Sequence, residues 1–413
     1  MRIVVLGAGI IGLAAAHALL DEGHEVEIVD GEGPAAGTSQ GNAGWIEHLD
    51  VMPLASPKVW RHLPRWLADP EGPLAISPGY LPQLAPWLWR FVLASRPGRL
   101  DASTRAIRAI NAQSLPAWER RLKALGLEGL LRRRGFLSVW LKEGDWKASQ
   151  KMLELQRGFG IEVETLGGDE ARKLEPALGP AIMAGAFYPT GANVNDPKLF
   201  TLALAEKALE RGAKLTLGHV ARIEPQEAGV ILRGFEGQVV AQGERVVLSA
   251  GIWSKPLAAS LGDRVQLDTE RGYNLTLEPG RLGLTRPVYY EGLAFVTTPL
   301  DTGDRIGGSV EFAGLKAPPN WKRVDAIIGR VKRALPHFDP RPGEGRRWMG
   351  FRPSTPDSLP IIGASPQDPR VVHAYGHGHY GLTQAAATAE AVAALIAGRK
   401  PAFDLKPYDP GRF

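Results

Sequence analysis

The chain has 413 residues, 44% of them apolar, which is enough for a large core and more than one domain usually needs. Lys and Arg number 49 against 44 Asp and Glu, and this excess is spread along the chain, so it does not indicate a nucleic acid partner. There is no cysteine, which excludes disulfides, thiolate–zinc sites and iron–sulfur clusters. No apolar run approaches the roughly 18 residues of a transmembrane helix, so none is predicted.

The first thirty residues predict a strand, a glycine turn, a helix and a second strand. Residues 3–6 form a short apolar run typical of a buried parallel strand, and GAGIIG follows at 7–12. The three glycines permit a tight turn, a close backbone approach to a pyrophosphate, and packing of the next helix, predicted at about 10–20. The second strand, 26–29, ends in Asp30, whose carboxylate suits ribose hydroxyls. A dinucleotide is therefore expected to contact Gly7, Gly9, Ile10, Ile11, Gly12, Asp30 and Gly31, with Glu32 as the alternative acid.

The next loop, PAAGTSQGNAG at 34–44, bears on which dinucleotide binds, because the glycine turn alone fits NAD equally well. Its small residues allow an extended cofactor to lie along the backbone. Ser39 is expected near the pyrophosphate, and Gly41, Asn42, Ala43 and Gly44 beside a flat ring. An ordinary surface loop is the alternative interpretation. We favour FAD, held non-covalently since no cysteine is present to link it; the same absence excludes a disulfide reductase.

Further segments are predicted to return to the same domain. A helix from Asp196 ends before Gly212, and the strand 214–217 follows. A buried strand at 244–249 leads into AG, and a strand from 371 leads through GHGHYGLT into an alanine-rich helix that ends near Gly398. The start of that helix would face the flavin pyrimidine edge, where negative charge develops on reduction. The expected contacts are Val220, Ala250, Gly251, Gly376, His377, Gly378, His379, Tyr380, Gly381, Leu382 and Thr383.

Five motifs in this order resemble the D-amino acid oxidase-like flavoprotein superfamily, most closely its D-amino acid dehydrogenase (small-subunit) branch. They are GAGIIG with Asp30, TSQGNAGW, SAGIWS, GFRPSTPDSLPIIG and GHGHYGLTQAAATAEAVAALIAG. The resemblance implies an α/β fold: a Rossmann-like FAD-binding domain with a discontinuous α+β substrate domain built on an antiparallel or mixed sheet. The FAD-binding domain would comprise 1–50, 188–262 and 343–413, and the substrate domain 51–187 and 263–342.

The resemblance also implies an activity. It is FAD-dependent oxidative deamination of D-amino acids to 2-oxo acids and ammonia, by hydride transfer from Cα to flavin N5. The electrons would pass to a quinone or a partner redox protein, as in a dehydrogenase, with an oxidase left open. The alternatives are a glycine, sarcosine or D-hydroxyproline oxidoreductase, a subunit of a multi-chain amine dehydrogenase, and a non-catalytic flavin-binding subunit.

Three residues are candidates for the active site. In the relatives, the arginine of the motif resembling GFRPSTPD binds the substrate carboxylate, which assigns that role to Arg352; a structural salt bridge is the alternative. His379 falls where relatives that act on glycine have a second carboxylate-binding arginine, and is expected to face the substrate. Tyr273 resembles a family strand over the flavin, although an ordinary strand tyrosine fits nearly as well. The HAYGHGH cluster is expected to use its backbone, and no metal site is predicted.

The segment 51–91 combines many prolines with Trp60, Trp66, Trp87 and Trp89, and a basic helical stretch follows at 101–125. Tryptophans in an irregular segment usually pack in a core. Contact with a membrane surface or a partner is the alternative, because Trp and Arg suit such an interface. The expected location is cytoplasmic, with peripheral contact at the inner face of the cell membrane left open.

Overall fold

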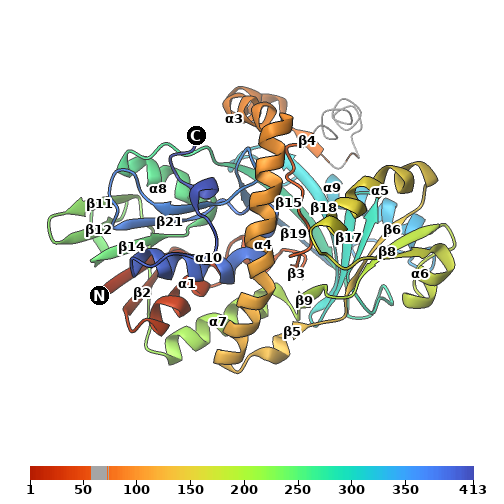
Figure 1. Cartoon of the computed structure of the whole chain (residues 1–413), viewed down its shortest axis with the longest axis horizontal. Helices are drawn as coiled ribbons and strands as arrows, with labels where there is room; N and C mark the ends of the chain where they lie inside the picture. Colours follow the sequence, from red (N-terminus) through yellow and green to blue (C-terminus); the bar gives the residue numbers. More distant parts are fainter. Residues whose placement is uncertain (57–71, 73) are drawn as a thin grey trace.

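The structure is a computed structural model that describes residues 1–56, 72 and 74–413. Figure 1 shows two large sheets on either side of the long helix α4 (Pro97–Leu125). One sheet carries the helices at both ends of the chain, α1 (Ile10–Asp21) and α10 (Gly381–Ile396), which pack against each other. The other sheet is larger and formed by the middle of the chain. This is the α/β arrangement with two sheets that the motifs imply.

The first sheet has six strands, of which the first five in the order run parallel. The apolar runs of the four central strands are buried on both faces, as is typical of parallel strands between two covering layers. In order across the sheet they are β10 (Lys214–Leu217), β2 (Glu25–Asp30), β1 (Arg2–Leu6), β14 (Arg245–Leu248), β21 (Val371–Tyr375) and the antiparallel β20 (Ile361–Ala364). The order reverses at β1, and ligands of such sheets bind where it does.

Helices cover one face of this sheet, and their positions confirm the predicted segments. The helix predicted at 10–20 is α1, and the one expected from Asp196 is α7 (Pro197–Glu210). A third helix, α8 (Ser254–Leu261), follows β14 and packs on the other face. Helix α4 also packs on this core: the Trp118 indole N–H donates to the Leu382 carbonyl at 2.8 Å.

The second sheet has nine strands. Along its main path the order is β19 (Arg346–Ser354), β15 (Asp268–Thr276), β18 (Gly303–Phe312), β17 (Phe295–Leu300), β16 (Val288–Glu291), β6 (Phe136–Trp140), β8 (Ala184–Tyr188) and β7 (Glu164–Gly167), and β4 (Leu74–Ile76) pairs with β18. Because side chains alternate between faces, the register of β15 with β19 puts Glu270, Gly272 and Asn274 on one face with Arg352 and Trp348. The helix α9 (Lys322–Ala334) packs on the opposite face.

The remaining elements are short. Two three-stranded sheets comprise β11 (Arg222–Gln226), β12 (Gly229–Arg233) and β13 (Val239–Gly243), and β3 (Trp45–Ile46), β9 (Ala192–Val194) and β5 (Leu131–Arg132). The other helices are α3 (Leu81–Ala94), α5 (Glu143–Gly158) and α6 (Gly168–Leu174). Single 3₁₀ turns lie at η1 (Thr38–Gln40), η2 (Pro78–Tyr80), η3 (Glu128–Leu130), η4 (Gly251–Trp253), η5 (Gly378–Tyr380) and η6 (Lys406–Tyr408).

Two elements cross the domain boundaries expected from the sequence. Strand β19 falls in the segment 343–413 expected to bind FAD, yet it pairs along its length with β15 of the nine-stranded sheet. Helix α4 falls in the segment 51–187 expected to bind substrate, yet it packs on α10. Local motifs do not reveal such long-range pairing. The division into two discontinuous domains stays a prediction.

The described tryptophans of the segment 51–91 lie on a regular helix, which differs from the irregular structure expected there. Pro82 stands in the first turn of α3, where a missing N–H is tolerated, while Pro86 lies inside the helix and obscures it in the sequence. Trp87 is buried, whereas Trp89 is 63% exposed. Trp60 and Trp66 lie outside the described residues.

Candidate active site

The glycine turn after β1 is packed so closely that side chains are excluded. Gly7 has φ +118°, and a Cβ on Gly12 would lie 1.9 Å from the Gly7 carbonyl oxygen. Helix α1 begins at Ile10 without a side-chain hydrogen bond from its N-cap residue. Instead, the Ile10 N–H donates to Ser39 Oγ at 2.9 Å, which brings Ser39 to the positive end of the helix. This geometry suits the phosphate contacts predicted for both residues.

Asp30 organises the turn that follows β2. Its Oδ2 accepts from the Ala8 N–H at 2.8 Å, and its Oδ1 accepts from the N–H groups of Glu32 and Gly33 at 2.9 Å. An ionised carboxylate has about four acceptor positions, so three such bonds leave room for one ribose hydroxyl. Glu32, the alternative acid, is exposed and lies 3.7 Å from a nitrogen of His219.

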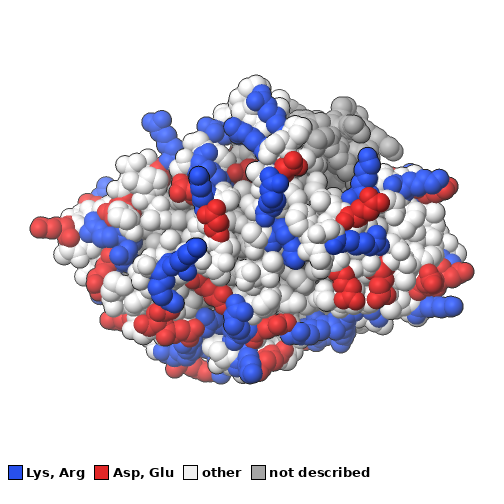
Figure 2. Space-filling view, viewed as in Figure 1, with Lys and Arg blue, Asp and Glu red and all other residues white. Residues whose placement is uncertain are grey.

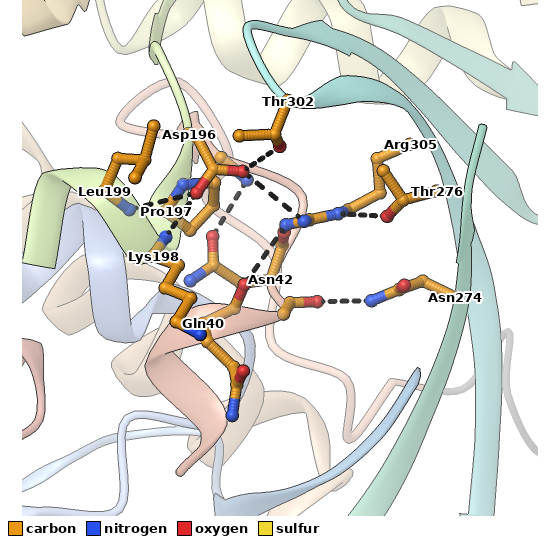
Figure 3. A network of polar contacts seen from close by, with 12 residues as sticks. Gln40, Asn42, Asp196, Pro197, Lys198, Leu199, Asn274, Thr276, Thr302 and Arg305 are labelled. Carbon is orange, nitrogen blue, oxygen red and sulfur yellow. Dashed lines mark hydrogen bonds and ion pairs between the residues drawn. The ribbon is translucent and has the colours of Figure 1, made fainter. Parts of the chain in front are cut away.

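The loop of residues 38–44 follows a strand of the six-stranded sheet, but a side chain of the nine-stranded sheet holds it in place. Figure 3 shows Arg305 of β18 reaching the loop, where its Nη1 donates to the Asn42 carbonyl at 2.7 Å. The same guanidinium lies 3.5 Å from Asp196, which caps helix α7 through the N–H groups of Lys198 and Leu199. Burial lowers the pKa of Arg305 to about 10, although Asp196 opposes that effect. Arg305 therefore remains a cation at neutral pH and ties the loop to α7.

A second side chain of the nine-stranded sheet also holds this loop. Asn274 of β15 donates from Nδ2 to the Gly41 carbonyl at 2.6 Å, and Figure 3 shows it approaching from the neighbouring strand. A Cβ on Gly41 would lie 2.3 Å from the Trp348 ring, so this position requires glycine. We call Arg305 and Asn274 the loop clamp. It fixes the backbone of the loop predicted to lie beside the flavin.

The three histidines of HAYGHGH have separate partners. His373 lies 2.8 Å from Asp263 Oδ2, His377 lies 3.0 Å from Thr388 Oγ1, and His379 lies 2.8 Å from Glu270 Oε2. Burial lowers the pKa of His377 to about 3, so it packs as a neutral side chain. Only His379 of the three lies with Arg352 on the candidate substrate side.

The loop before α10 continues the predicted cofactor contacts. Gly376 and Gly378 have φ +81° and +52°, conformations that favour glycine. The Tyr380 hydroxyl donates to Asp50 Oδ2 at 2.7 Å, and Thr383 Oγ1 accepts from the Glu47 N–H at 2.8 Å. Helix α10 thus begins without a side-chain cap, and its dipole is available to a negative group.

The other predicted cofactor contacts lie at the carboxyl ends of parallel strands or in the segments after them. Because those ends share one edge of the sheet, the structure brings these segments together there. The residues are Ile11 on α1, Gly31 after β2, Ala43 and Gly44 before β3, Val220 after β10, Ala250 and Gly251 after β14, and Gly381 and Leu382 on α10.

Arg352 projects from β19 onto the face of the sheet that also carries Glu270. Its guanidinium lies against Gly272, where an added Cβ would come within 2.4 Å of Cζ. Its Nη1 is buried and has no hydrogen-bond partner among the described residues. Burial lowers the pKa of Arg352, and the negative charge of Glu270 opposes this shift. A half-buried guanidinium whose buried Nη1 lacks a partner among the described residues is suited to binding a carboxylate.

Glu270 is a site residue that the sequence analysis did not single out. It stands directly across from Arg352 in the β15–β19 register and is 2% exposed. Burial alone would raise the pKa of Glu270, but His379 and Arg352 outweigh that effect and hold this pKa below its usual value. The sequence signal was that Glu270 lies two residues before Gly272 on one predicted strand. Its relation to Arg352 became evident only from the strand pairing.

Tyr273 is not brought together with Arg352. The alternation of β15 places it on the opposite face, where it is 1% exposed. Its hydroxyl donates to Glu311 Oε2 at 2.5 Å and accepts from the Asn320 N–H at 3.0 Å. Its contact with substrate stays a prediction, and these two partners favour a structural role.

The residues present fit FAD. The glycine turn and the two helix starts without side-chain caps provide positive backbone dipoles for the pyrophosphate and the pyrimidine edge. Asp30 retains acceptor capacity for a ribose, and the loop clamp presents an ordered glycine-rich loop between the sheets. The arrangement therefore suits a dinucleotide site next to an arginine that is suited to binding a carboxylate.

Comparison with known proteins agrees with this geometry. The family model described as FAD dependent oxidoreductase (DAO) matches residues 2–395. A D-amino-acid oxidase of Bradyrhizobium diazoefficiens is 35% identical over 100% of this chain and 99% of its own length. A D-amino acid dehydrogenase of Dechloromonas aromatica is 30% identical over 97% of this chain and 98% of its own. The crystal structure of glycine oxidase from Geobacillus kaustophilus superposes with a TM-score of 0.76 at 23% identity, covering 100% of this chain and 99% of that one.

The chain belongs to the DAO family of FAD-dependent oxidoreductases. It is an enzyme, and FAD is its cofactor. The likeness to glycine oxidase supports the fold, which has the mixed α/β architecture expected from the motifs.

Proposed function

We propose that the protein oxidatively deaminates D-amino acids to 2-oxo acids and ammonia. The observation that carries this proposal is the buried Nη1 of Arg352, which has no partner among the described residues and lies on the sheet face that carries Glu270, itself bonded to His379. Full-length relatives named D-amino-acid oxidase and D-amino acid dehydrogenase support the substrate class.

The residues of the chain supply binding and orientation. Arg352 takes the substrate carboxylate on its free guanidinium edge, and Gly272 leaves the space that this position of the guanidinium requires. Fixing the carboxylate restricts how the neighbouring Cα–H bond can point, which is how an enzyme lowers the entropy cost of reaction. Bound FAD supplies the electron sink that accepts the hydride from Cα. The resulting imine is hydrolysed by water.

Anaerobic reduction of the purified holoenzyme tests this proposal. D-alanine should bleach the flavin absorbance, whereas L-alanine should leave it unchanged. The same measurement with D-proline, glycine and sarcosine compares the alternative substrates on one preparation. If no member of a D-amino acid panel bleaches the flavin faster than glycine or sarcosine, the proposed substrate class is wrong. If nothing bleaches it, a non-catalytic flavin-binding role replaces the proposal.

For the electron acceptor, we propose a quinone or a partner redox protein, with reactivity toward oxygen as the alternative. Relatives carry both names, oxidase and dehydrogenase. Parallel assays with an artificial dye and with peroxide detection separate the two. Dye reduction without peroxide supports a dehydrogenase, and stoichiometric peroxide in air contradicts it.

We also propose peripheral contact with an anionic membrane through helix α3. In the described part of the chain, none of the helices has both the length and the apolar character of a membrane span. Helix α3 exposes Leu81, Trp89 and Val92 and has no acidic residue, while Arg96 and Arg99 follow it. Such a surface suits anionic lipid headgroups. Trp89→Ser should reduce sedimentation with anionic liposomes at low salt, and an unbound wild-type protein would contradict the idea.

A further inference from the structure

A carboxylate and an imidazole form a dyad beside Arg352. Glu270 lies across from Arg352 on the neighbouring strand, and its Oε2 is 2.8 Å from Nε2 of His379, which lies on η5. Glu270 is nearly inaccessible, whereas the His379 side chain is 31% exposed. The carboxylate is thus fixed inside the protein, and part of the imidazole is accessible.

The dyad determines where the imidazole carries its hydrogen. The charges around Glu270 keep it ionised, and an ionised carboxylate only accepts hydrogen bonds. Nε2 of His379 must therefore donate, which leaves the lone pair of the neutral ring on Nδ1, on the far side of the ring. A carboxylate that fixes a histidine tautomer in this way prepares the other nitrogen as a base.

The substrate needs a base at this position. A free amino acid is an ammonium ion at neutral pH, and a hydride leaves Cα only when the nitrogen lone pair is available. The ammonium and the carboxylate are bonded to the same carbon, so a base for the ammonium must lie close to the arginine that binds the carboxylate. Glu270 lies across from Arg352 on the neighbouring strand and contacts His379, so the arginine and the histidine flank the same carboxylate.

We propose that Nδ1 of His379 removes the proton from the substrate ammonium, and that Glu270 is the positioning residue that holds the required tautomer. The ammonium N–H bond breaks, its electron pair stays on nitrogen, and the proton passes to Nδ1. The protonated His379 returns this proton to water before the next turnover. This inference rests on the proposed function.

The dyad includes one carboxylate, and a cation lies on the strand next to it. Glu270 faces the ring from β15 and Arg352 lies across from Glu270 on β19, so the two offset each other. The other nearby titratable groups are hydrogen-bonded: Asp268 of β15 accepts from the Tyr80 hydroxyl of η2, and Tyr380 on the element of His379 donates to Asp50. The substrate carboxylate adds a further negative charge.

The test compares His379→Asn with wild type in the rate of flavin bleaching by D-alanine as a function of pH. At neutral pH the variant should lose about 100-fold in kcat/KM, the usual contribution of a positioned base. Its rate should then recover about tenfold per pH unit as alkaline solvent takes over the deprotonation. Glu270→Gln should show a smaller loss with the same alkaline recovery. Equal pH profiles for wild type and His379→Asn would overturn the proposal.

Two further measurements separate the possible failures. Propionate is D-alanine without its amino group, so its dissociation constant should stay within about threefold in His379→Asn if Arg352 binds the carboxylate. Weaker propionate binding with no alkaline recovery would assign His379 to carboxylate binding and overturn the base role. His337→Asn is the matched control, because this exposed histidine hydrogen-bonds only to the Leu282 carbonyl among the described residues. Absence of bleaching in wild type itself would contradict the proposed function rather than the dyad.

Discussion

At the scale of single residues, a substitution at Gly272 should impair substrate binding without impairing folding. A Cβ at this position would lie within 2.4–2.5 Å of the Arg352 guanidinium atoms, and that guanidinium is the far end of a flexible side chain. Gly272→Ala should therefore displace Arg352 while leaving the fold intact. We expect KM for D-alanine to rise at least about tenfold, equivalent to about 1.4 kcal/mol, with little change in the midpoint of thermal unfolding.

The control for this substitution is Gly329→Ala. Gly329 lies in the exposed part of α9 with open space around its Cβ position, so alanine should leave KM unchanged there. An unchanged KM in Gly272→Ala as well would show that the position of the Arg352 guanidinium does not control substrate binding.

Tyr273 should behave in the opposite way. Removing its hydroxyl in Tyr273→Phe deprives the buried Glu311 carboxylate of this donor and the Asn320 N–H of this acceptor. We expect a loss of about 1–3 kcal/mol in the free energy of unfolding, measured by urea denaturation, and nearly normal kcat/KM. A large loss of kcat/KM at unchanged stability would instead support the contact with substrate predicted from the sequence.

At the scale of elements, the loop clamp joins a cofactor loop to a strand of the other sheet. Arg305→Met removes the hydrogen bond to the Asn42 carbonyl and leaves Asp196 without this cation. Hydrogen bonds of charged groups contribute about 1.5–3 kcal/mol, so the dissociation constant of FAD should rise by about 10-fold to 100-fold, measured by fluorescence titration of the apoprotein. Arg305→Lys retains the charge, so its FAD dissociation constant should lie between those of wild type and Arg305→Met. Unchanged FAD affinity in Arg305→Met would mean that the loop keeps its form without the clamp.

Sequence reasoning succeeded where a local pattern fixes a local structure. The turn at Gly7 to Gly12, helix α7 with its cap at Asp196, and the start of α10 depend on residues adjacent in the chain. Arg352 was identified from a motif. Glu270, Arg305 and Asn274 were not, because their roles arise from strand pairing and from contacts between segments far apart in sequence.

At the scale of the whole molecule, charge is distributed rather than concentrated. Figure 2 shows basic and acidic side chains interspersed over the visible face, in keeping with the small net charge of +5. The pH response of stability should therefore depend more on individual buried groups than on overall repulsion.

Two buried histidines should make the free energy of unfolding fall as the pH decreases. Burial lowers the pKa of His17 to about 4 and that of His377 to about 3. The unfolded chain binds these protons near pH 6.5, so it binds more protons than the folded state below that pH. Their stabilisation is complete above about pH 6.5 and is lost as the pH falls toward those lower values.

Each histidine should lower the free energy of unfolding by up to about 1.4 kcal/mol per pH unit below about pH 6. Urea denaturation at several pH values between about 6 and 5 measures this slope before most carboxylates titrate. His17→Gln, which can still donate to the Leu204 carbonyl, should reduce the slope by up to about 1.4 kcal/mol per pH unit. A slope that the substitution leaves unchanged would contradict the assignment to His17.

The loop clamp has a thermodynamic consequence for the holoenzyme. The loop of residues 38–44 contacts Arg305 and Asn274 of the nine-stranded sheet. A ligand that orders this loop therefore also stabilises the native packing between the two large sheets. A free FAD concentration one hundred times its dissociation constant adds about 2.7 kcal/mol to the free energy of unfolding. The interface between the two sheets should therefore resist proteolysis better when FAD is bound than when the protein lacks it.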